Sequence, residues 1–367
     1  MKKIITCVAS TNTSSNKNRV SKILTIVVVL TFSFELLTFN CSAQDVHFSQ
    51  FGQTPQLINP GATGVFSGNV RGILNYRSQW SAFGDPYNTY AASFDVPIAK
   101  GNGRHAYFGL GANFYKDVAG QADFGNFLGA LSFSGIVPIS DYHTISVGIQ
   151  TGFGQYSANL ARLTWGSQFN GEEFDLELNS NESFAFQSSR YFDLGAVIYY
   201  EFKNTTSEFL GSDISSFNVG VASYHLNTPD QNFLSDTKDE IPRKFIAQFS
   251  GTFDIRETKV SLVPSMFYAF QGPYREITPG MLFKIRFGNT TKYSGLFKDG
   301  AIYFGSHYRL KDAIIPQVYI EFTDYMIGVS YDYNNSELSS VTGGNGGFEI
   351  SIRYVNKPKA LQRASFK

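Results

Sequence analysis

The chain has 367 residues and a formal net charge of zero, and only 16% of its residues are charged, against about a quarter in a typical globular protein. Aromatic residues make up 16%, with 35 Phe and 21 Tyr, and there are 34 Gly, yet the mean hydropathy is slightly negative at −0.14. The zero charge and the absence of a basic stripe argue against a nucleic-acid partner. The hydropathy excludes a helical membrane protein, and the composition favours strands with two different faces.

Residues 1–43 have the features of a secretory signal peptide. Basic residues precede an apolar run over 23–39, and Ser42-Ala43 forms a small-residue cleavage site before Gln44. Two alternatives stay open: a membrane anchor, because the apolar run approaches spanning length, and a lipoprotein acylated at Cys41. Cys41 and Cys7 are the only cysteines, so we expect no disulfide and no cysteine metal site in the mature chain. No cofactor is predicted.

Residues 44–68 form a turn-rich segment with neither a helical nor a strand period. The segment contains an Asn59-Pro60-Gly61 turn and few charges. A solvated linker would need no particular residues, and Phe48, Phe51 and Ile58 are poor choices for one. We therefore favour a plug or docking element that packs inside the rest of the fold or against a periplasmic partner, with a plain tether as the alternative.

From residue 69 to residue 355 the apolar residues alternate with polar ones at period two. In 325–334, tyrosine, isoleucine and valine occupy one face, and glycine, serine and aspartate occupy the other. Fourteen such segments are predicted, and their spans are 69–78, 88–97, 105–115, 124–137, 142–154, 190–201, 215–226, 243–254, 258–269, 277–288, 299–309, 313–322, 325–334 and 347–355.

The strand pattern predicts an all-β fold, a transmembrane antiparallel up-and-down β-barrel of about 14 strands. The even number and the length of the segments suit a barrel that crosses an outer membrane. A soluble β-sandwich is the alternative, but its outward face would be charged, whereas the non-apolar face here is mostly Gly, Ser, Asn and Gln. Residues 356–367 form a C-terminal tail.

The predicted connections alternate between short and long. The longest, 155–189 and 227–242, fall on the same side, which we take as the outside of the cell. Both termini are then expected in the periplasm. The connection 202–214 is long for a periplasmic turn, and 310–312 is short for an outer loop.

The chain shows no convincing catalytic or metal-binding motif. Its five histidines are scattered at positions 47, 105, 143, 225 and 307. His307 is expected to share a luminal face with Tyr303 and Arg309. Ser306 is adjacent to His307 and so points to the opposite face, which excludes a dyad between the two. The acidic residues of 172–182 suit calcium in principle, but a solvated loop is favoured. The chain is therefore predicted not to be an enzyme.

Four short motifs resemble the start of the PorP/SprF family of outer-membrane proteins, which is associated with the type IX secretion system of the Bacteroidota. The motifs are HFSQF (47–51), NPGATG (59–64), YRSQW (76–80) and TYAASFDVPI (89–98). Gly61 and Ser78 replace the alanine and asparagine usual in the family. The motif residues singled out for plugging or partner contact are His47, Phe48, Gln50, Phe51, Asn59, Pro60, Tyr76, Arg77, Gln79 and Trp80.

The resemblance implies a function that composition does not reach. A member of this family would support the secretion or surface attachment of a large adhesin-like protein with a C-terminal secretion domain, in some cases for gliding motility. Its partners would be that cargo, the type IX secretion components and outer-membrane lipid. Two alternatives are kept: a transport channel for a small apolar ligand, resembling the fatty-acid channels, and a membrane-embedded esterase.

Two side-chain placements follow for the motif at the end of the first strand. Trp80 suits the aromatic belt near the outer rim. Arg77 is predicted to face the lumen and to form an ion pair with Asp95 on the next strand.

Overall fold

The computed structural model describes residues 45–81, 85–101, 105–175, 177–181, 187–208, 211–231, 239–287, 300–336 and 339–356. The predicted signal peptide and all of the predicted C-terminal tail beyond residue 356 lie outside these ranges. Within the described ranges, no helix is both long enough and apolar enough to span a membrane.

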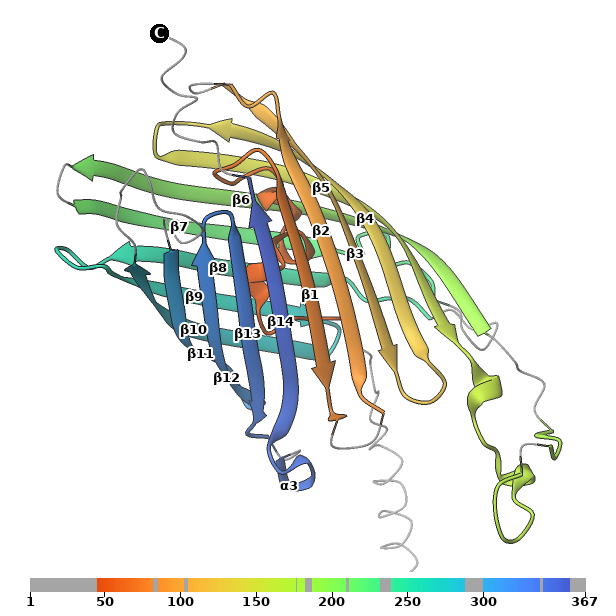
Figure 1. The fold of residues 1–367 in the computed structure, drawn as a ribbon. Helices are drawn as coiled ribbons and strands as arrows, with labels where there is room; N and C mark the ends of the chain where they lie inside the picture. Colours follow the sequence, from red (N-terminus) through yellow and green to blue (C-terminus); the bar gives the residue numbers. More distant parts are fainter. Residues whose placement is uncertain are drawn as a thin grey trace, which may run out of the picture. The chain divides into compact units, whose positions relative to one another are not determined.

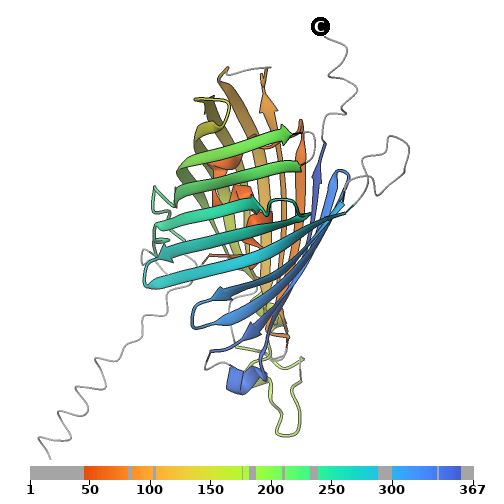
Figure 2. The same cartoon turned by 90° about the vertical axis from the view of Figure 1, so that its left-hand side faces the viewer.

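Fourteen antiparallel strands close into one barrel, in which each strand pairs with its neighbours in sequence and β1 pairs with β14 (Figures 1 and 2). The strands are β1 Arg71–Gln79, β2 Tyr87–Ile98, β3 Tyr107–Ala119, β4 Phe124–Pro138, β5 His143–Ala158, β6 Gln187–Glu208, β7 Gly211–Tyr224, β8 Lys244–Asp254, β9 Val260–Gln271, β10 Tyr274–Phe287, β11 Gly300–Arg309, β12 Ala313–Phe322, β13 Tyr325–Asn334 and β14 Asn345–Val355. Closure leaves no sheet edge, so every strand can pair its backbone in hydrocarbon.

The predicted fold class and strand number are confirmed. Most predicted boundaries lie within a few residues of the observed ones, and the spans of β12 and β13 agree in full. The largest difference concerns β6 and β7, which are longer than the alternation indicated and pair as far as Glu208 and Gly211. The connection expected over 202–214 is therefore only the two residues between these strands.

The outer wall is apolar, as hydrocarbon requires. Along β13 the residues of one face, Tyr325, Val329 and Tyr333, are exposed, whereas Met326, Ser330 and Asp332 of the other face are buried. The same alternation on β5 exposes Val147, Ile149 and Phe153. The predicted two-faced strands thus present their aromatic and aliphatic side chains to lipid and their small and polar side chains to the lumen.

The two ends of the barrel differ in their connections. One end, here called the long-loop end, carries the connections 159–186, 225–243 and 335–344, the last of which includes the short helix α3 (Ser339–Thr342). The first of them contains two 3-10 turns, η4 (Leu160–Arg162) and η5 (Gly166–Gln168). The other end, here called the terminal end, carries the start of β1 and the end of β14. Part of 225–243, namely 232–238, lies outside the described residues.

The lumen is occupied by residues 45–68, here called the plug segment, which appears in orange and red inside the barrel (Figures 1 and 2). It forms three short turns: η1 (Phe51–Gln53), α2 (Pro55–Ile58) and η2 (Pro60–Ala62). The segment starts at the long-loop end, where Asp45 contacts His225 and Lys244. It finishes at the terminal end, where the Asn69 amide donates to the Asn356 carbonyl.

This path differs from the expectation that both termini of the mature chain share the periplasmic side. Asp45 and Asn356 lie at opposite ends of the barrel, because the plug segment crosses the lumen before β1 begins. Counting strands cannot reveal such a crossing, since the crossing segment is not a strand.

Candidate functional site

The plug segment is built from consecutive tight turns that its sequence specifies. Pro55 and Pro60 occupy the first turns of α2 and η2, where a missing N–H costs nothing. The Asn59 side chain accepts a hydrogen bond from the Gly61 amide at 3.0 Å and so caps η2. Asn59 and Pro60 are both buried. The predicted Asn-Pro-Gly turn is therefore a capped bend inside the barrel.

Glycines on the inner wall make room for this bend. A Cβ atom at Gly109 would lie 2.2 Å from the Thr63 carbonyl oxygen, and one at Gly220 would lie 1.9 Å from Asn59 Nδ2. At Gly148 a Cβ would lie 3.1 Å from the backbone of Gly61. These wall glycines come from β3, β5 and β7. Gly109 and Gly148 therefore let two backbones approach closely, and Gly220 makes room for the Asn59 side chain.

The first half of the plug segment, around Ser49 and Gln50, is held by the Glu349 carboxylate on β14. The backbone amides of Ser49 and Gln50 donate to the two carboxylate oxygens of Glu349 at 2.6 and 2.8 Å. Arg77 on β1 lies beside the same carboxylate, with its Nε 3.2 Å from Glu349 Oε1, and its guanidinium donates to the His47 carbonyl. Arg77 and Glu349 are almost fully buried, at 0% and 1% exposed.

A second arginine and two further carboxylates complete this charged group. Asp332 on β13 is 3.2 Å from both Arg77 and Arg309, and it accepts a hydrogen bond from Ser49 Oγ at 2.8 Å. Arg309 on β11 also contacts Glu276, at 3.3 Å. We call Arg77, Glu276, Arg309, Asp332 and Glu349 the central charge cluster. Charges at membrane depth are costly unless paired, and here each is paired around the plug segment.

The predicted ion pair between Arg77 and Asp95 is wrong. Asp95 instead forms a bidentate pair with Arg71, at 2.9 and 2.7 Å, and accepts the Gly64 amide at 2.8 Å. The strand register explains the difference, because Arg71 lies directly opposite Asp95 whereas Arg77 lies opposite Thr89. Arg77 does face the lumen, as expected, but its carboxylate partners come from β13 and β14.

At the long-loop end the plug segment begins in a second charged contact. His225, which follows β7, is 2.8 Å from Asp193 and 2.7 Å from Asp45, and Lys244 lies 3.5 Å from Asp45. Burial disfavours the imidazolium, but the two carboxylates outweigh it and raise the pKa of His225 to about 9. Near neutral pH a charged His225 therefore joins the start of the plug segment to the barrel wall.

Two aromatic side chains of the first family motif anchor the plug segment by packing. Phe51 stacks on Phe267 at 5.5 Å between ring centroids and meets the His307 ring edge-on at 5.2 Å. Phe48 is buried in a separate cluster that includes Tyr115 and Tyr191. Gln50 is also buried, and its amide bonds to side chains of β13 and β14. His47 lies near the long-loop end, beside Gln79 and Trp80.

The remaining motif residues split between the two sides of the wall. Tyr76 stands on the lipid side, where its hydroxyl bonds to Asn88 at 2.9 Å and its ring meets Tyr90. Trp80 packs edge-on against Tyr87 at the long-loop end. That position agrees with the aromatic belt expected for Trp80. The motif at 76–80 therefore joins a luminal anchor to lipid-facing aromatics at one rim.

The predicted luminal face of His307 also agrees with the structure. His307 is buried, and its Nε2 lies 2.6 Å from Ser265 Oγ on β9, whereas Ser306 points outwards and is exposed. In the acidic loop, Asn170 accepts hydrogen bonds from the backbone amides of Glu172 and Glu173. No group of three or more possible metal ligands occurs among the described residues.

The residues that sequence reasoning missed are mainly the partners of the plug segment. These are Asp45, Arg71, Asp193, His225, Glu276, Asp332 and Glu349. Arg309 was expected on the luminal face, but its contacts were not. One signal could have found several of them: a charged residue on the non-lipid face of a membrane strand is rare and needs a partner. Which charges pair depends on register around the closed barrel, and local sequence does not carry that information.

Comparisons with known proteins identify the family. No curated protein matches the chain. Among solved structures, the chain is distantly similar to the translocator domain of autotransporter NalP from Neisseria meningitidis, with 9% identity, a TM-score of 0.39, and coverage of 79% of this chain and 89% of that one. It is also distantly similar to CdiB from Acinetobacter baumannii, with 6% identity, a TM-score of 0.42, and coverage of 78% of this chain and 60% of that one. A third similarity is to the P. putida toluene transporter TodX, with 10% identity, a TM-score of 0.40, and coverage of 83% of this chain and 94% of that one.

These structural similarities are too distant to bear on function. The family model described as type IX secretion system membrane protein PorP/SprF matches residues 40–354, which include the whole plug segment and nearly the whole barrel. The four motifs that suggested this family lie within the match, two of them in the plug segment and two in β1 and β2. The chain therefore belongs to the PorP/SprF family of type IX secretion system membrane proteins.

Proposed function

We propose that this chain is a non-enzymatic, plugged outer-membrane barrel that supports the secretion or surface attachment of a large adhesin-like protein carrying a C-terminal secretion domain. The observation that carries the proposal is the plug segment, which is fixed in the lumen by the central charge cluster and by the wall glycines. A lumen filled in this way does not suit passage of a folded cargo. The barrel then acts as a scaffold, and cargo is bound outside its lumen.

In this proposal the long-loop end faces the cell exterior. The connections 159–186 and 225–243 then form the contact surface for the cargo, since loops on a rigid scaffold are where such contacts usually occur. Within 159–186, the exposed Phe169 and Phe174 rings pack together at 5.3 Å. An exposed aromatic pair on an outer loop is a natural contact for a protein partner.

A gene deletion followed by surface proteomics tests the proposal. We expect one large surface adhesin to disappear or accumulate in the periplasm while other surface proteins stay unchanged, and complementation should restore it. Complementation with Phe169→Ser/Phe174→Ser should restore the barrel in the membrane but not the adhesin. The matched control is Phe124→Ser, which changes an exposed aromatic at the start of β4.

An unchanged surface proteome in the deletion strain would sink the proposal. Loss of uptake of a small apolar compound, with normal surface proteins, would instead favour the transport-channel alternative. A gliding defect that accompanies loss of the adhesin would assign this copy to motility.

A further inference from the structure

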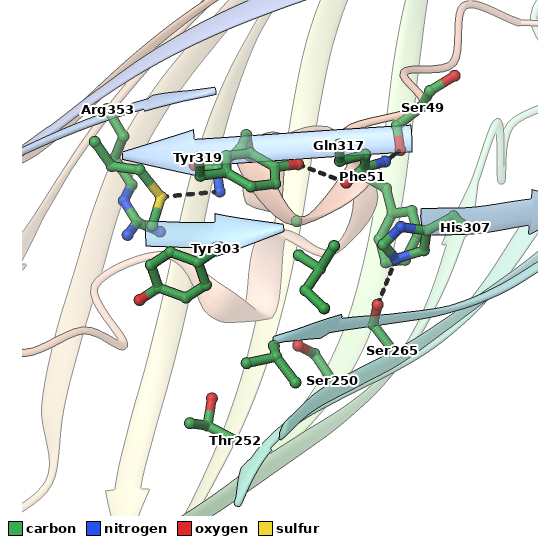
Figure 3. A pocket seen from close by; sticks show the side chains of 15 residues that line it. Ser49, Phe51, Ser250, Thr252, Ser265, Tyr303, His307, Gln317, Tyr319 and Arg353 are labelled. Atoms are coloured by element: carbon green, nitrogen blue, oxygen red, sulfur yellow. Dashed lines mark hydrogen bonds between the residues drawn. The ribbon is translucent and has the colours of Figure 1, made fainter. Parts of the chain in front are cut away.

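A cavity of about 270 Å³ remains in the lumen between η1 of the plug segment and the wall formed by β8 to β14 (Figure 3). Arg353 lies on one side of it, and the hydrogen-bonded pair Ser265 and His307 lies on the other (Figure 3). Thr252 and Met326 also line the cavity and, like Arg353, lie within two residues of the strand ends at the terminal end. The cavity is therefore on the terminal-end side of the charges that hold Ser49 and Gln50.

Arg353 differs from the three arginines that bond the plug segment. Arg71, Arg77 and Arg309 each form ion pairs with carboxylates inside the barrel. Arg353 is half-buried on the luminal face of β14, and no hydrogen bond or ion pair reaches it from any described residue. A guanidinium inside a barrel is expensive unless it has a partner or lines a wet site. Arg353 is partly exposed at the cavity wall, so the partner available to it is a molecule bound in the cavity.

Two residues that line the same cavity, Gln53 and His307, each also carry a polar atom that is buried away from the cavity and has no partner among the described residues. Gln53 is 7% exposed and His307 is 4% exposed. The Oε1 atom of Gln53 and the Nδ1 atom of His307 have no hydrogen-bond partner within the described structure. The opposite atoms of both side chains are engaged, Gln53 Nε2 with Met326 Sδ at 3.4 Å and His307 Nε2 with Ser265 Oγ at 2.6 Å. Unmet polar groups of this kind are costly, so the protein leaves polar groups beside this cavity unsatisfied.

The rest of the lining defines what such a partner would be. Phe51, Val263 and Leu282 supply an apolar surface, while Ser250 and Thr252 supply hydroxyl groups. A planar carboxylate matches the guanidinium fork, and an apolar body matches the surface beside it. We propose that this cavity binds a small carboxylate-bearing organic molecule, with the carboxylate on Arg353 and the body against Phe51 and Leu282. The proposal does not depend on the secretion function.

Calorimetric titration of the purified mature barrel tests the site, with benzoate as the probe and benzamide as its neutral counterpart. We expect benzoate to bind and benzamide to bind at least tenfold more weakly, because only benzoate offers the guanidinium a charge. Arg353→Gln should weaken benzoate binding about tenfold or more. Arg286→Gln is the matched control, since Arg286 already pairs with Asp254 at 2.8 Å and does not line the cavity.

A second variant keeps the proposal testable if Arg353→Gln fails to fold. Val263→Phe fills the cavity without altering any charge and should abolish benzoate binding. Folding of each variant is checked by heat-modified mobility on a gel. Equal affinities for benzoate and benzamide, an undiminished affinity in both cavity variants, or an equal loss in Arg286→Gln would each overturn the proposal.

Discussion

The two halves of the plug segment are held in the lumen by different physical means. Ser49 and Gln50 bind through their backbone amides to Glu349, within a cluster of buried, paired charges. The bend from Asn59 to Gly64 rests against β3, β5 and β7, where wall glycines leave room for its backbone and for the Asn59 side chain. One half is therefore fixed by a cluster of five charges. The other is fixed by close packing against the wall, together with the single Arg71–Asp95 pair that bonds the Ala62 carbonyl and the Gly64 amide.

The difference teaches which substitutions each half tolerates. A buried charge that loses its partner keeps its desolvation cost without compensation, so the charged half depends on every member of the cluster. The shape-held half depends on the absence of side chains, so the addition of a single methyl group disturbs it. The charged half should respond to pH and to charge-neutralising pairs of mutations. Among the described residues, the shape-held half has no histidine contact and a single ion pair, so it should not respond to pH near neutrality.

The largest expected effect comes from Arg77→Gln. Loss of this cation leaves Glu349 and Asp332 with Arg309 as the only remaining cation of the cluster, which should lower the free energy of unfolding by about 3–5 kcal/mol. Urea titration of the barrel in lipid vesicles measures the change. Arg162→Gln is the control, because Arg162 is 55% exposed in its pair with Asp123 and should cost about 1 kcal/mol or less.

A double variant separates charge imbalance from lost packing. Arg77→Gln combined with Glu349→Gln removes one charge of each sign and should recover part of the loss. If the loss of unfolding free energy in the double variant equals the sum of the losses in the two single variants, the cluster acts through packing. The contrast between the two halves of the plug segment then fails.

A smaller effect is expected from pH at the start of the plug segment. The pKa of His225 is raised to about 9 from an ordinary value of 6.5, because Asp45 and Asp193 outweigh the effect of burial. The stabilisation is thus fully present below pH 6.5 and is lost as pH rises through about 9, and it amounts to at most about 3 kcal/mol. Hydrogen exchange of the amides of 45–50 should accelerate over this window.

His225→Gln is the matched variant for the pH experiment. It keeps a hydrogen-bonding side chain but removes the titration, so exchange should be faster at pH 6.5 and should lose the histidine-dependent part of its pH response. Amides of 59–64 should show no matching acceleration beyond the chemical effect of pH on exchange. If both groups of amides respond together, the plug segment moves as one unit and the two halves are not independent.

The sequence was sufficient to predict most of the fold. Alternation at period two depends only on which side of the wall a side chain faces, so it predicted fourteen strands and the lipid-facing aromatics of β13. It missed the ends of β6 and β7, because pairing beyond the apolar part of a strand leaves no hydrophobic signal. It also missed the crossing of the lumen, because the plug segment has no period.

The contacts of the site were less predictable than its members. Phe48, Phe51 and Ile58 stood out because they were unusual for a linker, and all three are buried. The partner of Arg77 was predicted wrongly because adjacency in sequence favours β2, whereas barrel closure brings β14 beside β1. Glu349 lies 300 residues from Ser49 in sequence, and no local pattern links the two.

The smallest expected effect comes from replacing a glycine by alanine. The change in the free energy of unfolding should have opposite signs at two wall glycines. Alanine is usually about 0.5–1 kcal/mol more favourable than glycine within a strand, through chain entropy. Gly135→Ala on β4 should follow that rule, since nothing lies within 4 Å of its Cβ position. Gly109→Ala on β3 should instead destabilise by about 1–3 kcal/mol, because the added carbon overlaps the Thr63 carbonyl. Urea titrations of both variants give the two signs directly.

The outcome at Gly109 decides whether the fit of the plug segment is a property of the wall. If Gly109→Ala destabilises the native barrel but not a chain truncated to begin at Gly64, the cost arises from the contact with the plug segment. If the cost persists after truncation, it arises within the wall itself, from the nearby Ser134 hydroxyl, whose oxygen would lie 2.4 Å from the new carbon. The close fit at Gly109 would then belong to the β3–β4 pair itself, and shape complementarity with the plug segment would rest on Gly148 and Gly220.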